Sequence, residues 1–244
     1  MSMPSRVAPS PDVRIVEHAD PDALAVALAE SVAASLTEAV AARGVATLVV
    51  PGGRTPVALF RALSRIELPW SSVMVTLTDE RRVPADDPQS NAHLVHTHLL
   101  AGAARAARFV PLAGDPGGDA AQATRSCCKR LAGLPRPYDV VILGMGGDGH
   151  TASLFPGRIP GGPDADCAAV TAPVAPEGRL SQSAARLAAT RRLIVYFTGH
   201  DKRAVFDQAL ADVGTTKPLP IAAVARQADC PVELYWADTP GGPA

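Results

Sequence analysis

A histidine in a glycine-rich turn is the residue of this sequence best suited to acid–base chemistry. The turn reads GMGGDGH over residues 144–150, so Asp148 precedes His150 by two positions. Imidazole is the usual general base at neutral pH, and a neighbouring carboxylate orients it and raises its basicity. A buried core histidine is the competing interpretation, but five glycines within residues 144–157 disfavour a packed core position. We therefore interpret His150 as a base and Asp148 as its partner.

The same turn also matches the pattern G-x-G-x-x-G of dinucleotide-binding proteins. Two features disfavour that interpretation. Pro156 would stop the following helix, and no second strand ends in an acidic residue about 20 positions further on. Asp164 and Asp166 instead fall in a loop rich in proline and glycine.

Two further segments carry residue types that bind phosphate. In PGGRTP, residues 51–56, Gly52 and Gly53 allow close backbone approach, and Thr55 can begin a helix whose free amides attract an anion. A plain turn is the competing interpretation, and the lysine of a nucleotide-binding P-loop is missing.

Lys202 falls in the first turn of an expected helix, where a cation opposes the helix dipole unless an anion is bound. A lysine facing solvent fits the spacing equally well.

The segment TDERRVPADDPQSN, residues 78–91, crowds charges of both signs at a strand end. Arg81 can hold a phosphate with two hydrogen bonds, while an acid such as Asp79 orients the ligand. For Glu80 and Arg82 we prefer a surface ion-pair cluster, and we interpret Ser90 as a helix cap.

No metal or organic cofactor is expected. His93, His96 and His98 do not share one helix face, and the sequence contains no HExxH, GxSxG or CxxC motif. The four cysteines follow no zinc or disulfide spacing, and adjacent Cys127 and Cys128 could pair only with strain. We expect reduced thiols in a cytoplasmic protein.

The elements that must position these residues alternate between apolar strands and helices rich in alanine and leucine. The expected strands are residues 13–17, 45–50, 73–78, 109–110, 138–143, 191–198 and 232–236. The expected helices are residues 20–43, a helix from 55–56 onward, 90–101, 119–131 and 201–211. This alternation predicts an α/β fold with a doubly wound, mostly parallel sheet and helices on both faces. Residues 157–175 are expected to form a surface loop.

Composition narrows the possible functions. The 244 residues predict one domain, with residues 1–12 as a flexible N-terminal extension. Lysine and arginine total 23 against 24 acidic residues, so the basic excess of a nucleic-acid binder is absent. No apolar run reaches the roughly 18 residues of a membrane helix, and no signal peptide is apparent. We expect no nucleic-acid or membrane partner, and a monomer.

Taken together, these segments resemble the 6-phosphogluconolactonase family, which is grouped with glucosamine-6-phosphate isomerase/deaminase. The resemblance runs from about residue 13 to 236. The segments that carry it are LGMGGDGHTASLFPG at 143–157, TDERRVPADDPQSN at 78–91, PGGRTP at 51–56, PEGRLS at 176–181 and TGHDK at 198–202. The family's turn reads SGGSTP, so Pro51 and Arg54 replace its two serines.

The resemblance implies hydrolysis of 6-phospho-D-glucono-1,5-lactone to 6-phospho-D-gluconate in the oxidative pentose phosphate pathway. By position, His150 would activate water beside Asp148, and Arg81 and Lys202 would hold the phosphate. The other implied substrate-binding residues are Gly52, Gly53, Thr55, Asp79, Asn91 and Arg179. A lactone is an activated ester, so a base and oxyanion donors suffice without metal or covalent intermediate. For the donors we favour backbone amides within residues 146–151.

Two alternatives remain. The isomerase/deaminase enzymes follow Gly-x-Asp-Gly-His with Ile-Ala-Phe-Asn-Glu-Pro, whereas this chain has TASLFPG and places Phe155 where those enzymes have a catalytic glutamate. A non-catalytic sugar-phosphate sensor would keep Arg81 and Lys202 but would not need His150. We favour the lactonase.

Overall fold

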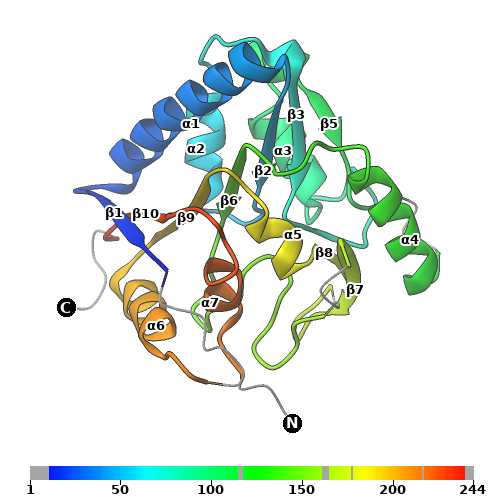
Figure 1. Ribbon diagram of the computed structural model, residues 1–244. Coiled ribbons are helices and arrows are strands. Elements are labelled where there is room, and N and C mark those ends of the chain that lie inside the picture. The colour runs from blue at the N-terminus through cyan, green and yellow to red at the C-terminus, as the bar shows by residue number, and fades with distance from the viewer. Residues whose placement is uncertain (1–10, 115–117, 161–164, 177, 216, 240–244) are drawn as a thin grey trace.

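Seven parallel strands form the central sheet, in the order β1-β10-β9-β6-β2-β3-β5 (Figure 1). The computed structural model describes residues 11–114, 118–160, 165–176, 178–215 and 217–239. The strands are β1 (Val13–His18), β2 (Ala46–Val50), β3 (Val73–Leu77), β5 (Arg108–Val110), β6 (Val140–Leu143), β9 (Leu193–Thr198) and β10 (Val232–Ala237). Every residue of β2, β3 and β6 is buried, as expected for apolar strands covered on both sides.

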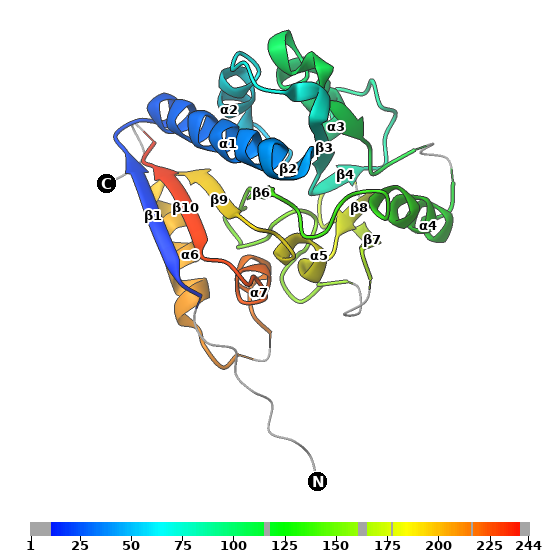
Figure 2. The ribbon, with the colours of Figure 1, turned by 45° about the horizontal axis from the view of Figure 1, so that its top comes forward.

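Helices cover both faces of this sheet, which confirms the predicted doubly wound α/β architecture. The helices are α1 (Pro21–Arg43), α2 (Pro56–Leu63), α3 (Asn91–His98), α4 (Ala120–Leu131), α5 (Ala184–Ala188), α6 (His200–Ala211) and α7 (Pro220–Ala225), and 3-10 turns span Trp70–Ser72 and Gly102–Ala106. Figure 2 shows α1 and α2 on one face and α6 and α7 on the other. The short helices α5 and α7 were not expected from the sequence.

The long helix α1 shows how local sequence sets an element. Asp20 caps its first turn by accepting a hydrogen bond from the amide of Ala23, and Gly44 ends it at φ 74°. By length and composition alone, α1 would also qualify as a candidate membrane span. Most of its large apolar residues, Leu24, Leu28, Val32 and Leu36, are buried in the core instead, whereas Val26 is exposed. Packing therefore accounts for its apolar composition.

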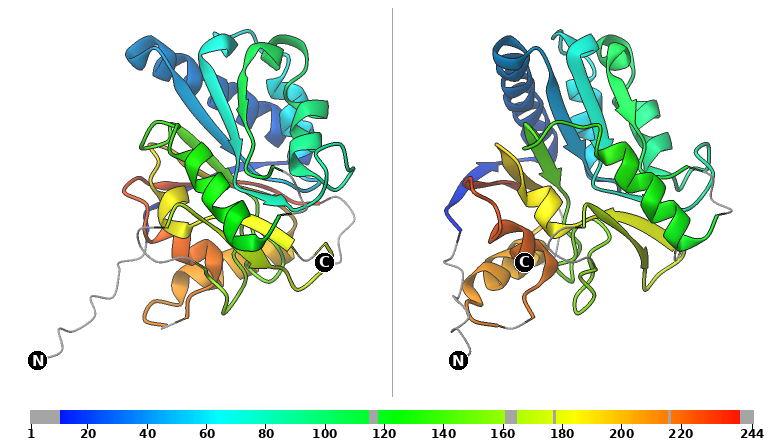
Figure 3. Two further views of the ribbon diagram at one scale, coloured as in Figure 1. Left: turned by 90° about the vertical axis from the view of Figure 1, so that its right-hand side faces the viewer. Right: turned by 45° about the vertical axis from the view of Figure 1, so that its right-hand side comes forward.

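A second, antiparallel sheet of three strands lies beside the first, in the order β4-β8-β7. It consists of β4 (Asp79–Arg81), β8 (Gly178–Gln182) and β7 (Cys167–Thr171). The expectation of a surface loop over residues 157–175 is wrong where β7 forms. This strand pairs with β8 and packs against α4, the green helix in Figure 3. Its order therefore depends on contacts distant in sequence.

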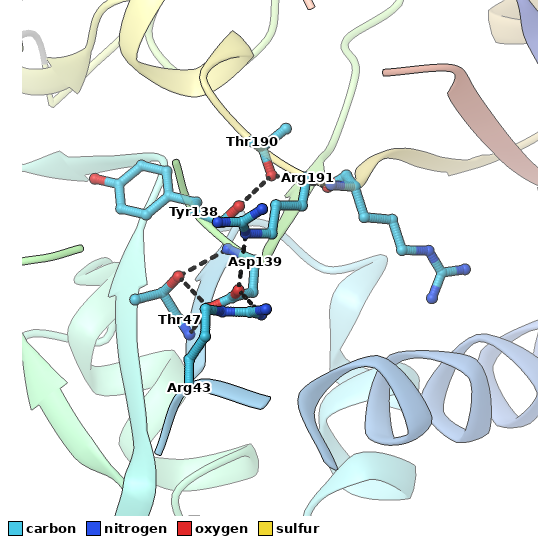
Figure 4. A network of polar contacts seen from close by, with 7 residues as sticks. Arg43, Thr47, Tyr138, Asp139, Thr190 and Arg191 are labelled. Atoms are coloured by element: carbon cyan, nitrogen blue, oxygen red, sulfur yellow. Dashed lines mark hydrogen bonds and ion pairs between the residues drawn. The ribbon is translucent and has the colours of Figure 1, made fainter. Parts of the chain in front are cut away.

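Buried Asp139 ties several elements together at the amino end of the parallel sheet (Figure 4). Its carboxylate accepts hydrogen bonds from Arg43 at 2.5 Å and from the amide and hydroxyl of Thr47 at 2.8 and 3.0 Å. The amide of Asp139 donates in return to the Thr47 hydroxyl at 2.8 Å, and Arg191 lies 3.6 Å from the carboxylate. This network links α1, β2, β6 and the segment before β9.

Element boundaries differ from the predictions by a few residues. The helix expected over residues 90–101 ends at His98, and the strand expected over 138–143 begins at Val140. Tyr138 makes only an isolated bridge to Thr190. Of the predicted N-terminal extension, residues 1–10 lie outside the described residues.

Candidate active site

The four loops singled out in the sequence converge at one end of the parallel sheet. They follow β9, β6, β2 and β3, which are consecutive neighbours in strand order. From β2 the chain runs outward through β3 and β5, whereas β6, β9 and β10 lie on the opposite side, so the order reverses between β2 and β6. Ligands of doubly wound proteins bind at such a reversal. A cleft of about 380 Å³ opens there, a volume suited to a small molecule.

The structure brings the predicted residues together around this cleft, with one exception. Lining it are Gly52, Gly53, Thr55, Asp79, Arg81, Asn91, His150, Arg179 and Lys202. Asp148 does not line the cleft but contacts His150. The cleft is also lined by Ser153, Phe155 and Tyr196, to which the sequence interpretation gave no binding role. Arg54, for which a phosphate contact and a solvent-facing position were both open, lines it as well.

Asp148 holds the ring and the backbone of His150 through one oxygen. His150 Nδ1 lies 2.5 Å from Asp148 Oδ1, and the amide of His150 donates to the same oxygen at 3.1 Å. Burial raises the pKa of Asp148, but these hydrogen bonds outweigh it and lower the pKa below its usual value. The carboxylate is therefore ionised at neutral pH and favours the tautomer with the proton on Nδ1. In that tautomer Nε2 is free to accept a proton.

The glycines of this turn make room for protein groups. A Cβ atom on Gly146 would lie 2.1 Å from His150 Cε1 and 2.8 Å from Asp148 Oδ1. Gly149 has φ +78°, and a Cβ there would lie 2.7 Å from Leu219. Glycine at position 146 thus allows the histidine and its carboxylate to fold back over the turn, and glycine at position 149 allows the left-handed backbone and the close approach of Leu219.

The expectation for the oxyanion donors is wrong for three amides of the turn. The amide of Gly146 donates to the carbonyl of His150 at 2.9 Å, and that of Gly149 donates to the carbonyl of Gly146 at 3.0 Å. The amide of His150 is bound by Asp148. These groups stabilise the turn and have no hydrogen to offer a substrate.

Two arginines face each other across the β4–β8 pair. Arg81 and Arg179 are directly paired in the antiparallel register, where side chains on the same face approach closely. Arg179 is only 7% exposed and donates from Nε to the carbonyl of Pro176 at 2.8 Å. Its pKa is lowered first by burial and then by the charge of Arg81. A bound anion would relieve this repulsion, so the pair suits a phosphate group.

Asn91 connects Arg81 to the glycine turn after β2. Arg81 Nη1 donates to Asn91 Oδ1 at 2.8 Å, and Asn91 Nδ2 donates to the carbonyl of Asp79 at 2.9 Å. A Cβ on Gly52 would lie 2.1 Å from Asn91 Oδ1. Gly52, expected to admit a ligand, thus first of all makes room for Asn91.

Glu80 is an interior residue, so the expected surface ion pair is wrong at this position. Glu80 is 2% exposed, and its carboxylate accepts hydrogen bonds from the amides of Arg81, Asn91 and Ala92, each at 2.7 Å. The hydroxyl of Ser90 donates to it at 3.1 Å. Burial raises the pKa of Glu80 despite these bonds. The carboxylate thereby fixes the start of α3, where Ser90 is the predicted cap.

Asp79 is held by two hydroxyl groups. Ser153 Oγ donates to Asp79 Oδ2 at 2.6 Å, and Thr78 Oγ1 donates to Asp79 Oδ1 at 3.1 Å. Ser153 belongs to the segment after His150, so this contact joins the acid–base turn to the arginine-bearing strand β4. Sequence interpretation missed Ser153 because nothing local marks its partner, 74 positions away.

The cleft is much more positive than the chain as a whole. Within the described part of the chain, the cleft is lined by four cations, Arg54, Arg81, Arg179 and Lys202, and by one carboxylate, Asp79, whereas the whole chain has a formal charge of −1. Lys202 is half-buried in the first turn of α6, and burial lowers its pKa. This concentration of cations favours an anionic ligand. Among the described residues, no group of three or more His, Cys, Asp or Glu is placed to hold a metal ion.

Several known proteins are similar to this chain over most of its length. A family model described as glucosamine-6-phosphate isomerases/6-phosphogluconolactonase matches residues 19–236. A 6-phosphogluconolactonase of Mesorhizobium japonicum is 47% identical over 222 residues, which cover 88% of this chain and 91% of the relative. A 6-phosphogluconolactonase of Rhizobium meliloti is 45% identical over 93% of this chain and 99% of the relative. The crystal structure of a 6-phosphogluconolactonase from Shewanella baltica superposes with a TM-score of 0.85 at 39% identity, covering 93% of this chain and 98% of that one.

Proposed function

The chain belongs to the glucosamine-6-phosphate isomerase/6-phosphogluconolactonase family, and on this premise we propose that it hydrolyses 6-phospho-D-glucono-1,5-lactone to 6-phospho-D-gluconate. The relatives with 45–47% identity are named for this activity. The observation that carries the proposal is a histidine, held at Nδ1 by a carboxylate, in a cleft lined by four cations. That combination suits the attack of water on a lactone whose ester group is uncharged and whose phosphate group is anionic.

The cations would bind the 6-phosphate. Arg81 and Arg179 face each other across the β4–β8 pair, and Lys202 adds a third charge from α6. The turn containing Gly53 and Thr55 would add amides from the start of α2. Asp79 would accept hydrogen bonds from sugar hydroxyls, because Ser153 and Thr78 fix its orientation.

His150 would act as the base. Its Nε2 takes a proton from water as the water oxygen forms a bond to C1 of the lactone. The tetrahedral intermediate then collapses by breaking the bond from C1 to the ring oxygen, which receives the proton from Nε2. Water is thus added across the ester bond, and the histidine returns to its starting state. Asp148 would stabilise the imidazolium formed between the two steps.

The residue beside His150 favours hydrolysis over aminosugar isomerisation. The ring of Phe155 lies 5.2 Å from the ring of His150 and is 8% exposed. An isomerase/deaminase would use a carboxylate at this place in the sequence to move protons. An apolar ring cannot do so, although it can exclude bulk water from the histidine.

Three less specific expectations complete the proposal. We retain the prediction that the chain forms one domain and acts as a monomer, which size-exclusion chromatography with light scattering would test. We also retain a cytoplasmic location; the four free cysteines fit a reducing compartment.

The activity is tested by generating the lactone in place with glucose-6-phosphate dehydrogenase and following the δ-lactone by NMR. Acceleration over spontaneous hydrolysis by the purified protein supports the proposal. A parallel sample with glucosamine 6-phosphate tests for ammonia release. Ammonia release without lactone hydrolysis would replace the proposal by the isomerase/deaminase reaction. Phosphosugar binding without either reaction would indicate a sensor.

A further inference from the structure

Two cysteines from separate elements meet where α4 packs on the small sheet. Cys128 on α4 and Cys167 on β7 have their Sγ atoms 3.2 Å apart, and Cys128 Sγ also lies 3.8 Å from the carbonyl oxygen of Cys167. They are separated by 39 positions in the chain. Neither residue has a role in the proposed lactone hydrolysis.

We propose that Cys128 and Cys167 form a reversible thiol oxidation site that closes into a disulfide bond linking α4 to β7. A disulfide has an S–S distance of about 2.0 Å, so the sulfur atoms need to approach by only about 1.2 Å. Because α4 and β7 are already packed together, side-chain rotation supplies most of this approach. The adjacent Cys127 is fully buried, whereas Cys128 is half-buried and therefore reachable by a small oxidant.

A peroxide is the class of oxidant that fits the site. The thiolate of Cys128 attacks one peroxide oxygen, forming a sulfenic acid and releasing one water. The thiol of Cys167 then attacks the sulfur of Cys128, the S–S bond forms, and a second water leaves. The two thiols together lose two electrons and two protons, and hydrogen peroxide is reduced to two waters. A dithiol reductant reverses the change.

The surroundings make this oxidation slow at neutral pH. Burial, followed by the hydrogen bond with Cys167, raises the pKa of the Cys128 thiol above its usual value. A hydrogen bond with Cys127, followed by burial, raises the pKa of Cys167. Little thiolate is therefore present at pH 7, and the rate of oxidation should increase as the pH rises.

The disulfide bond would restrain the three-stranded sheet, which carries Arg81 and Arg179 of the cleft. Strand β7 pairs with β8, in which Arg179 lies opposite Val170, and β8 in turn pairs with β4. Closing a loop of this length restricts the unfolded chain, and we expect the midpoint of thermal unfolding to rise by roughly 10 °C. This inference does not rest on the proposed function, because its readouts are thiol content and unfolding temperature.

The test treats the full chain with hydrogen peroxide and counts thiols after denaturation. We expect the thiol count to fall from four to two, and to return to four with dithiothreitol. After tryptic digestion without reductant, residues 126–129 should be joined to residues 159–179. Because the first peptide contains both Cys127 and Cys128, variants must identify the partner.

The variants Cys128→Ser and Cys167→Ser should yield no linked peptide and no rise in unfolding temperature. Cys127→Ser is the matched control, since it removes the neighbouring sulfur and should still yield the link. Cys230→Ser removes the remaining thiol and should also yield it. A link that persists in Cys128→Ser but disappears in Cys127→Ser would overturn the assignment. Retention of all four thiols in the peroxide-treated chain, or oxidation without any link, would overturn the site itself.

Discussion

Replacing Gly146 by alanine should disable His150 without touching the phosphate-binding groups. The new Cβ would lie 2.1 Å from His150 Cε1, 2.2 Å from Nδ1 and 2.8 Å from Asp148 Oδ1. Ordinary carbon contacts need about 3.5 Å, so the ring must move by more than about 1 Å. A displacement of that size typically reduces turnover by about 100-fold. We therefore expect kcat to fall about 100-fold.

The assay compares this variant with Gly147→Ala, whose Cβ would meet no atom within 4 Å. Lactone hydrolysis is followed by NMR, and affinity for 6-phosphogluconate is measured by calorimetry. Gly147→Ala should behave like the unmodified protein, and Gly146→Ala should keep the affinity for the product. Equal activity of the two alanine variants would refute the reasoning, since it would mean that the ring position does not control turnover.

Three further predictions concern groups around and opposite the cleft. Glu80→Gln places an amide against backbone donors, so we expect a loss of about 1–3 kcal/mol in the free energy of unfolding by urea. KM should rise because the backbone amide of Asn91 loses its charged partner, while its side chain keeps its bonds to Arg81 and Asp79. Because burial lowers the pKa of Lys202 from 10.5, its charge should be lost at a lower pH than usual. Affinity for 6-phosphogluconate should then begin to weaken in calorimetry at a pH below the usual titration range of lysine. Lys202→Arg should not show this early loss, and an equal loss in both proteins would contradict the prediction. Asp139→Asn should lower the free energy of unfolding by about 1–3 kcal/mol, because it weakens the hydrogen bonds to Arg43 and Thr47. These partners lie at the other end of the sheet, so kcat and KM should stay unchanged. Altered kinetics at full stability would contradict this prediction.

The sequence predicts the main sheet well because its information is local. Each parallel strand is a continuous apolar run followed by a turn, and the carboxyl ends of these strands must share one edge. Neighbouring turns after β2 and β6 therefore meet, and a Cβ on Gly144 would contact Pro51 at 3.6 Å. The same rule predicts that His150, Arg81 and Lys202 lie around one cleft.

What the sequence could not predict depends on partners distant along the chain. Strand β4 has only three residues, and Arg81 is paired with Arg179, 98 positions away. Without knowledge of this pairing, the sequence places Glu80 in a polar loop among other charged residues. In the fold it is buried by the start of α3 and accepts four hydrogen bonds.

The central claim is that His150 supplies the base for lactone hydrolysis, and its removal tests this most directly. We would measure kcat of His150→Ala beside His18→Ala, a control on β1 that does not line the cleft. We predict a fall of about 100-fold or more for His150→Ala with unchanged affinity for 6-phosphogluconate, and normal turnover for the control. Near-normal turnover of His150→Ala would contradict the account and assign the base to another residue of the cleft.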